Sequence, residues 1–157
     1  MDETMDEVRG RVLVVGLGNE LLRDDGVGVH AARLLKVVLG EQALVVEVGT
    51  AVLSALHLFE AADKILAIDA MQAGGQAGAV YTFSPQDVAE NDRQLSIHEL
   101  NLVGSLRFLP EGRRAKQIKI IGVEPQTIEF GMELTGALQA ALPTVVATAR
   151  QIVEDWQ

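Results

Sequence analysis

The side chains of Asp25, Asp69 and His98 can together bind one metal ion. Each of the three residues lies at the end of a predicted helix or strand or in the turn next to one. Asp25 lies in the turn after an apolar run, Asp69 ends another such run, and His98 falls in the first turn of a predicted helix. Two carboxylates and one imidazole form a hard-to-borderline ligand set that suits nickel, zinc, iron or cadmium. The helix N-terminus disfavours imidazolium, which keeps His98 neutral and able to bind metal. Three protein ligands leave further coordination positions open.

Each of these residues also has a purely structural interpretation. Asp24 and Asp25 stand directly before a predicted helix, where acids commonly cap the exposed backbone N–H groups. Asp69 precedes the glycine-rich segment 70–77 and suits a turn, and His98 suits an exposed position on a helix. The spacing of the residues alone does not decide between a metal site and these structural roles.

Buried strands and amphipathic helices alternate along the chain, and this order places the candidate residues. Val12–Val15 is an apolar run typical of a strand buried on both faces of a parallel sheet. A helix over Val27–Val38 should follow, with Gly40 at its end. Further strands are expected at 43–48, 64–68 and 117–123. Parallel strands bring their carboxyl ends to one edge of the sheet, where open α/β folds bind ligands, so Asp25 and Asp69 should meet there.

The remaining elements complete a single domain over residues 11–157, preceded by a disordered acidic tail at 1–9. The linker 70–77 is too short for a helical crossover, so Gly78–Phe83 should return antiparallel to the third strand. Thr50 can cap a short helix, and Ser96–Glu99 forms a capping box that begins another. Pro143 should kink or restart a final helical region over Thr135–Trp156. The expected fold is a three-layer α/β/α sandwich with a mixed, mostly parallel five-stranded sheet.

Composition excludes several classes of protein. The chain has 157 residues, 48% of them hydrophobic, which fits one compact domain. It contains no cysteine, so disulfide scaffolds, thiolate metal sites and cysteine proteases are excluded. The formal net charge of -9 argues against nucleic acid as a partner. There is neither an apolar run long enough to span a membrane nor a signal-peptide pattern, so a cytoplasmic protein is expected.

The common catalytic and nucleotide-binding motifs are absent or incomplete in this sequence. Gly16-Leu17-Gly18 begins a dinucleotide fingerprint, but position 21 is Leu rather than Gly, and the following acids would repel a pyrophosphate. No serine stands in a Gly-x-Ser-x-Gly elbow. His98-Glu99 does not extend to a zinc-protease motif, because position 102 is leucine.

Several segments together resemble the hydrogenase maturation endopeptidases, which remove the C-terminal extension from the large subunit of nickel-iron hydrogenases. The resemblance covers residues 11–153. The segments that carry it are Gly16–Gly28, Gly49-Thr50, Ile68–Ala70, Leu95–Leu100, Gly122–Pro125, Glu129–Gly131 and Glu133–Thr135.

The resemblance implies that Asp25, Asp69 and His98 are the nickel-recognition ligands and the residues on which catalysis depends. The first of these positions is Glu or Asp in the family, whereas the position of Glu20 is not always acidic. The resemblance also places substrate contacts at Gly49 and Thr50. One departure is visible: Val48 replaces the first glycine of the family's Asp-Gly-Gly-Thr loop, which should stiffen that loop.

The expected function is therefore that of an endopeptidase acting on a nickel-loaded hydrogenase large-subunit precursor. Nickel would be supplied by the substrate, with zinc or cadmium able to substitute in crystals, and the protein would act as a monomer without nucleic acid or membrane. Two alternatives remain from the residues: a non-proteolytic nickel-binding maturation factor that uses the same three ligands, and a nucleotide-binding module.

Overall fold

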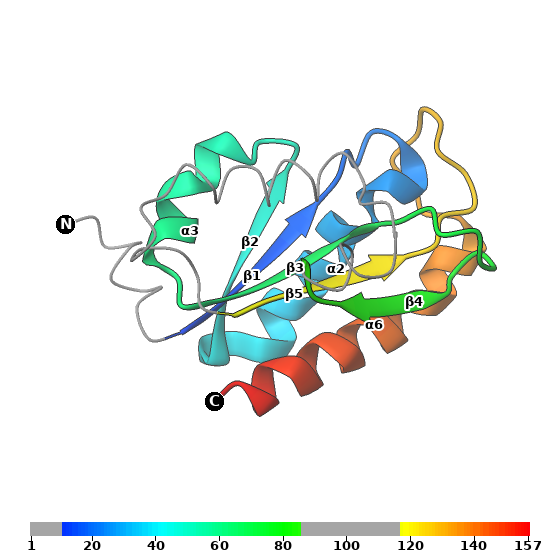
Figure 1. Cartoon of the computed structure of the whole chain (residues 1–157). Coiled ribbons are helices and arrows are strands. Elements are labelled where there is room, and N and C mark those ends of the chain that lie inside the picture. Colours follow the sequence, from blue (N-terminus) through cyan, green and yellow to red (C-terminus); the bar gives the residue numbers. More distant parts are fainter. Residues whose placement is uncertain (1–10, 86–116) are drawn as a thin grey trace.

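A five-stranded sheet forms the centre of the protein in the computed structural model, which describes residues 11–85 and 117–157 (Figure 1). The strands lie in the order β2-β1-β3-β5-β4. Their bounds are Val12–Leu17 (β1), Ala43–Gly49 (β2), Lys64–Ala70 (β3), Val80–Phe83 (β4) and Gln117–Val123 (β5). The predicted strands are all present, although β4 begins two residues later than expected.

The sheet is mostly parallel, as the sequence predicts. β1 is parallel to β2 and β3, and β3 is parallel to β5. β4 runs antiparallel, but its hydrogen-bonded partner is β5, from Val80↔Val123 to Phe83↔Ile120. β5 therefore lies between β4 and β3. The short linker correctly indicates the reversal of direction, but the neighbour of β4 is decided by a strand that comes later in the chain.

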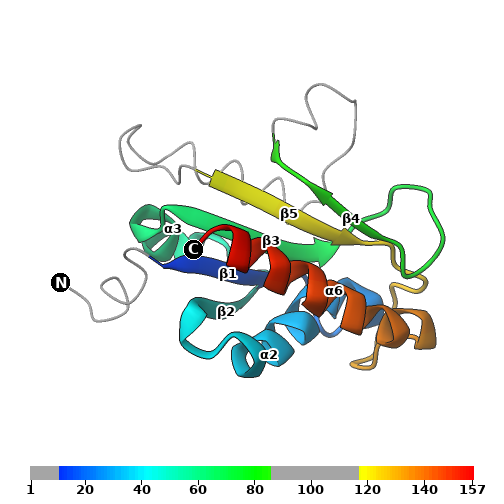
Figure 2. The same ribbon diagram turned by 90° about the horizontal axis from the view of Figure 1, so that it is seen from below.

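Helices cover both faces of the sheet, which confirms the three layers (Figure 2). α2 (Val27–Leu39) and α6 (Gly136–Asp155) share one aliphatic core with the sheet, in which Leu35 and Leu138 are fully buried. α3 (Leu56–Ala61) packs on the opposite face through Leu58 and Phe59. α2 ends at Gly40, as predicted, and Gly40 has a positive φ of 52°, which glycine adopts readily.

Two glycines let α2 approach the sheet closely. A Cβ atom at Gly28 would collide with the carbonyl oxygens of Ile68 and Leu17, and one at Gly16 would collide with the Gly28 carbonyl. Larger side chains at either position would push the helix away from β1 and β3. The start of α2, and the turn that contains Asp25, are thereby held against the edge where β1 and β3 end.

One local prediction is wrong, and a second is wrong in one of its two alternatives. Thr50 caps no helix, because the 3-10 helix η3 (Leu53–Ala55) has Val52 at its N-cap and α3 follows it directly. Pro143 does not restart the final helix, because α6 continues through it, and a kink at Pro143 stays a prediction. Pro143 is exposed, and so is Gln139, whose carbonyl loses its partner N–H. Water can reach that carbonyl, which lowers the cost of proline in this helix.

Some sequence predictions lie outside the described residues. They are the acidic tail at 1–9, the capping box Ser96–Glu99 and the helix that should follow it, and His98. Within residues 11–85 and 117–157, no helix is long and apolar enough to cross a membrane.

Candidate active site

The turn after β1 brings Asp25 and Asp69 to one point at the edge of the sheet. Gly18 adopts φ 110°, and its N–H donates to the Gly49 carbonyl at 3.1 Å. A Cβ atom at Gly18 would collide with the backbone carbonyl of Asp25 and would lie 2.9 Å from Asp69 Oδ1. Only glycine fits between these two groups. The convergence of β1 and β3 ends therefore occurs as the parallel topology predicts.

Asp69 is a fully buried carboxylate at the end of β3. Its Oδ1 accepts a hydrogen bond from the N–H of Ala70 at 2.8 Å. A buried carboxylate is costly unless hydrogen bonds or a cation compensate for the lost hydration. Its position at a strand end, where ligands bind in this class of fold, distinguishes it from an ordinary turn residue.

Asp25 lies half-buried in the 3-10 helix η1 (Arg23–Gly26). Its Oδ2 accepts a hydrogen bond from the N–H of Asn19 at 2.9 Å. The N-cap of α2 is Gly26, and no side chain bonds to the exposed amides there. Asp25 therefore does not cap α2, and its carboxylate is instead fixed to the turn that leaves β1.

Asp24 has a different environment, although it is adjacent in sequence. Its fully buried carboxylate accepts four hydrogen bonds: from the Thr135 N–H at 2.8 Å, the Thr135 hydroxyl at 2.7 Å, the Gln126 N–H at 2.9 Å and the Thr127 N–H at 3.1 Å. Asp24 thus joins η1 to the loop after β5 and to the N-cap residue of α6. Its carboxylate bonds to these groups and not to the start of α2, so the sequence interpretation of Asp24 as a cap of α2 is wrong.

These hydrogen bonds stabilise the charged form of Asp24. Burial raises the pKa of the carboxyl, but the bonds from Thr135, Thr127 and Gln126 outweigh burial and hold the pKa below its ordinary value of 3.8. A group with a lowered pKa contributes stability that is fully present above its unfolded-state pKa and is lost as the pH falls through the folded-state pKa.

We expect the stability that Asp24 gives to the contact between η1, the loop after β5 and α6 to be lost in acid. The free energy of unfolding of the wild type should exceed that of Asp24→Asn by a constant amount above about pH 5, and the gap should narrow below about pH 4, where the unfolded-state carboxyl becomes protonated. Urea unfolding of both proteins between about pH 2.5 and about pH 7 would test this. Because asparagine does not titrate, a gap of constant size through the acid range would contradict the assignment.

Glu20 belongs to an ion-pair network on the outer side of the turn. Its Oε2 lies 2.6 Å from Arg33 Nη2, and the same guanidinium contacts Glu47 at 2.8 Å. Lys36 Nζ lies 2.6 Å from the other Glu47 oxygen. The hydrogen bond from Lys36 is the main reason that the pKa of Glu47 is lowered. The carboxylate of Glu20 is thus paired with Arg33 of α2. We expect that Glu20 is not a metal ligand.

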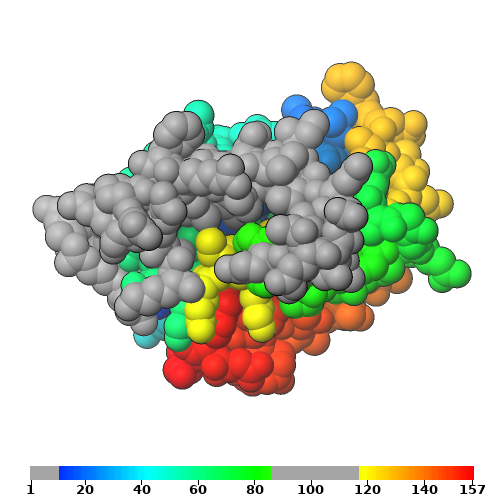
Figure 3. Space-filling model, in the orientation of Figure 1, coloured from blue at the N-terminus to red at the C-terminus, as the bar shows by residue number. Residues whose placement is uncertain are grey.

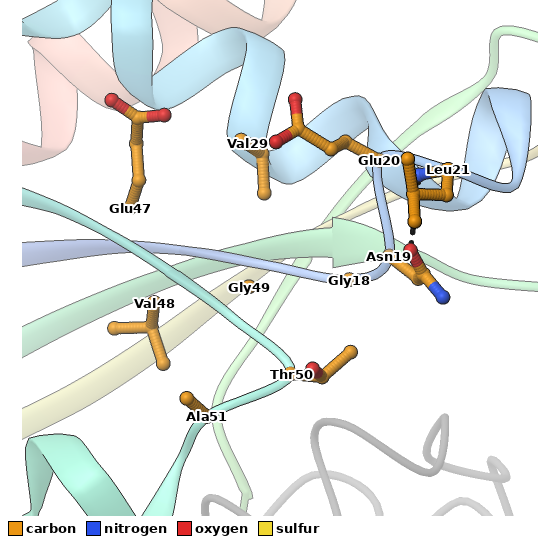
Figure 4. Close-up of a pocket in the computed structure, with 10 residues that line it drawn as sticks. All are labelled: Gly18, Asn19, Glu20, Leu21, Val29, Glu47, Val48, Gly49, Thr50 and Ala51. Carbon is orange, nitrogen blue, oxygen red and sulfur yellow. Dashed lines mark hydrogen bonds between the residues drawn. The ribbon is translucent and has the colours of Figure 1, made fainter. Parts of the chain in front are cut away.

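A cavity of about 400 Å³ lies beside the turn. Its walls are residues 18–21 of the turn, residues 47–51 at the end of β2 and directly after it, and Val29 of α2 (Figure 4). Gly49, with φ 62°, and Thr50 are in this wall, so the expected substrate-binding residues line a real depression. Val48 is buried in the core shared with α3. The stiffening of the loop stays a prediction.

The structure therefore brings together two of the three expected metal ligands, Asp25 and Asp69, and describes nothing of the third, His98. Within residues 11–85 and 117–157, no three His, Cys, Asp or Glu side chains are grouped as a metal site. The ligand set remains a prediction. The residue that sequence reasoning missed is Asp24, and the only signal was the pair of adjacent acids.

Asp25 and Asp69 lie at one edge of the parallel sheet, beside a cavity, and comparison with known proteins identifies the class of protein. A model of the hydrogenase maturation protease family matches residues 29–152, which is more than half of the chain and lies C-terminal to Asp25. The chain belongs to the hydrogenase maturation protease family and is a peptidase.

Individual relatives agree in length and fold. The hydrogenase 2 maturation protease of Escherichia coli is 30% identical over 152 residues, covering 90% of this chain and 92% of the relative. The structure of the E. coli hydrogenase maturating endopeptidase HybD has a TM-score of 0.80 at 26% identity, covering 92% and 93% of the two chains. The [NiFe] hydrogenase maturation protease HybD of Thermococcus kodakarensis has a TM-score of 0.77 at 31% identity, covering 91% and 99%.

Proposed function

We propose that the protein removes the C-terminal extension of a [NiFe] hydrogenase large-subunit precursor after nickel has been inserted. The observation that supports this proposal is that the backbone of Asp25 and the carboxylate of Asp69 both lie against Gly18, beside a cavity, in a member of the hydrogenase maturation protease family. We assign His98 as the third ligand. The nickel ion belongs to the substrate in this proposal, and the protein binds it only while the precursor is bound.

Carboxylates held in fixed positions suit a protein that must distinguish a nickel-loaded precursor from a nickel-free one. The Ala70 amide holds Asp69, and the Asn19 amide holds Asp25, so both side chains are oriented before the substrate arrives. Two carboxylates and an imidazole supply three ligands, and the precursor's own nickel ligands complete the coordination. A precursor without nickel brings no cation to these carboxylates, so it gains none of the coordination energy that the nickel-loaded precursor gains.

The residues around the turn position the peptide. In this proposal an extended segment of the precursor lies in the cavity that Gly18, Gly49 and Thr50 line. A peptide bond placed next to substrate nickel can be activated by polarisation of its carbonyl or by a metal-bound water of lowered pKa. In either case Asp25, Asp69 and His98 determine where the ion lies relative to the scissile bond.

The test compares one precursor in nickel-loaded and nickel-free forms. The purified protein should shorten only the loaded form, because only that form completes the coordination, and intact-mass spectrometry would show release of one C-terminal peptide. Cleavage of both forms at equal rates would refute nickel recognition while leaving protease activity intact. Tight nickel binding by all three residues without any cleavage would instead favour the non-proteolytic maturation factor.

A further inference from the structure

Four apolar side chains are exposed together beside the candidate active site. They are Leu21, Ile128, Phe130 and Met132, which have 51%, 42%, 88% and 59% of their surface exposed. We call them the apolar patch. Ile128, Phe130 and Met132 belong to the loop between β5 and α6, which stands out next to the turn after β1 (Figures 1 and 3). Grouped exposure of large apolar side chains on a protein surface marks interaction sites.

The backbone beneath the apolar patch is firmly held. The N–H of Gly131 donates to the Leu21 carbonyl at 3.0 Å, and the N–H of Arg23 donates to the Gly131 carbonyl at 2.8 Å. Arg23 Nε also donates to the Glu133 carbonyl at 3.1 Å. At the two ends of the loop, Gln126 and Thr135 are bound to the buried Asp24. The patch is therefore presented on an ordered backbone, which reduces the entropy lost on binding.

The apolar patch is continuous with the candidate active site. Leu21 belongs to the patch and also lines the cavity with Gly49 and Thr50. Asp24, which holds the loop, is followed directly by Asp25. A large molecule whose chain end enters the cavity would therefore cover the patch with its folded body.

The charges around the patch indicate whether a second copy of this protein or a different protein binds there. Exposed Glu129 lies 3.6 Å from Arg23 Nη1, and Glu133 is also exposed, so the border of the patch is mainly acidic. The whole chain carries a formal net charge of -9. A second copy would place acidic borders together, whereas a partner with an apolar depression and a basic border would be complementary.

We propose that the apolar patch is the docking surface for the folded body of the precursor, separate from the site that receives its nickel and its C-terminal extension. This inference rests on the proposed function. Phe130 and Met132 are the expected anchors, because aromatic and methionine side chains are enriched at interface centres. The patch supplies affinity that does not depend on nickel.

The test uses the double substitution Phe130→Ser and Met132→Ser. With nickel-free precursor, which is not cleaved, Kd measured by biolayer interferometry should rise about tenfold or more, because two interface anchors are lost. With nickel-loaded precursor, KM should rise about as much while kcat stays within about twofold, the pattern of lost uniform binding. The matched control is Val37→Ser on α2, where the side chain is 85% exposed, and it should change neither value.

Each other outcome has a definite meaning. An unchanged Kd and KM in the double variant, with wild-type cleavage intact, would overturn the docking surface and leave the proposed function standing. A wild type that binds the nickel-free precursor through the patch but cleaves no loaded precursor would overturn the proposed function alone. If sedimentation shows a wild-type dimer that the double substitution dissociates, a second copy occupies the patch and the proposal is wrong.

Discussion

Asp69→Asn is expected to lower the rate of precursor cleavage by about 10³-fold while leaving the fold intact. The substitution keeps the shape of the side chain and an oxygen that can accept the hydrogen bond from Ala70. It removes the negative charge that the proposed nickel contact requires. A metal contact worth about 4 kcal/mol in the transition state corresponds to about a thousandfold in rate. Single-turnover cleavage of nickel-loaded precursor would measure the loss.

The matched control for Asp69→Asn is Glu154→Gln, which also removes one carboxylate charge. Glu154 is exposed near the end of α6, where it lies 3.8 Å from Arg150 and does not line the cavity, so this variant should cleave at nearly the wild-type rate. Both variants should unfold close to the wild-type temperature. Equal losses in the two variants would mean that general negative charge, and not a defined ligand, supports cleavage. An active Asp69→Asn protein would remove Asp69 from the site.

The fold was predictable because its signals are local and periodic. Continuous apolar runs such as Val12–Val15 indicate strands buried on both faces, and α2 ends at Gly40 as the sequence indicates. The errors arise where distant parts of the chain decide. β4 is bonded to β5, which is thirty or so residues further along and cannot be chosen from the linker alone. Pro143 remains helical because its surroundings are exposed and α6 is packed elsewhere on the core.

The site was predictable to the extent that topology determines it. Parallel strands bring their carboxyl ends to one edge of the sheet, which predicts that Asp25 and Asp69 share that edge. The structure adds that β1 and β3 are direct neighbours. The role of Asp24 could not be predicted, because its partners are 102, 103 and 111 residues away in the sequence. No spacing rule separates the two adjacent acids. Only the folded loop after β5 shows which of them is buried.

Substitution of these adjacent acids should therefore affect different properties. Asp24→Ala should lower the free energy of unfolding by about 3–5 kcal/mol, because four donors lose a charged acceptor in a buried place. Asp25→Ala removes a half-buried carboxylate that accepts a hydrogen bond from the Asn19 N–H, and it should cost less than Asp24→Ala, about 1–2 kcal/mol. Urea unfolding at neutral pH compares the two directly.

The rate of precursor cleavage should fall more in Asp25→Ala than in Asp24→Ala, the reverse of the order expected for stability. Asp25→Ala should lose about 10²-fold or more of the cleavage rate at any temperature, because a proposed nickel ligand is missing. Asp24→Ala should retain measurable activity at temperatures where it is folded and lose it on warming, because its defect lies in the attachment of the loop and of α6. A stable but inactive Asp24→Ala protein would mean that Asp24 acts on the substrate or its metal. An unstable Asp25→Ala protein would mean that Asp25 also holds the fold together.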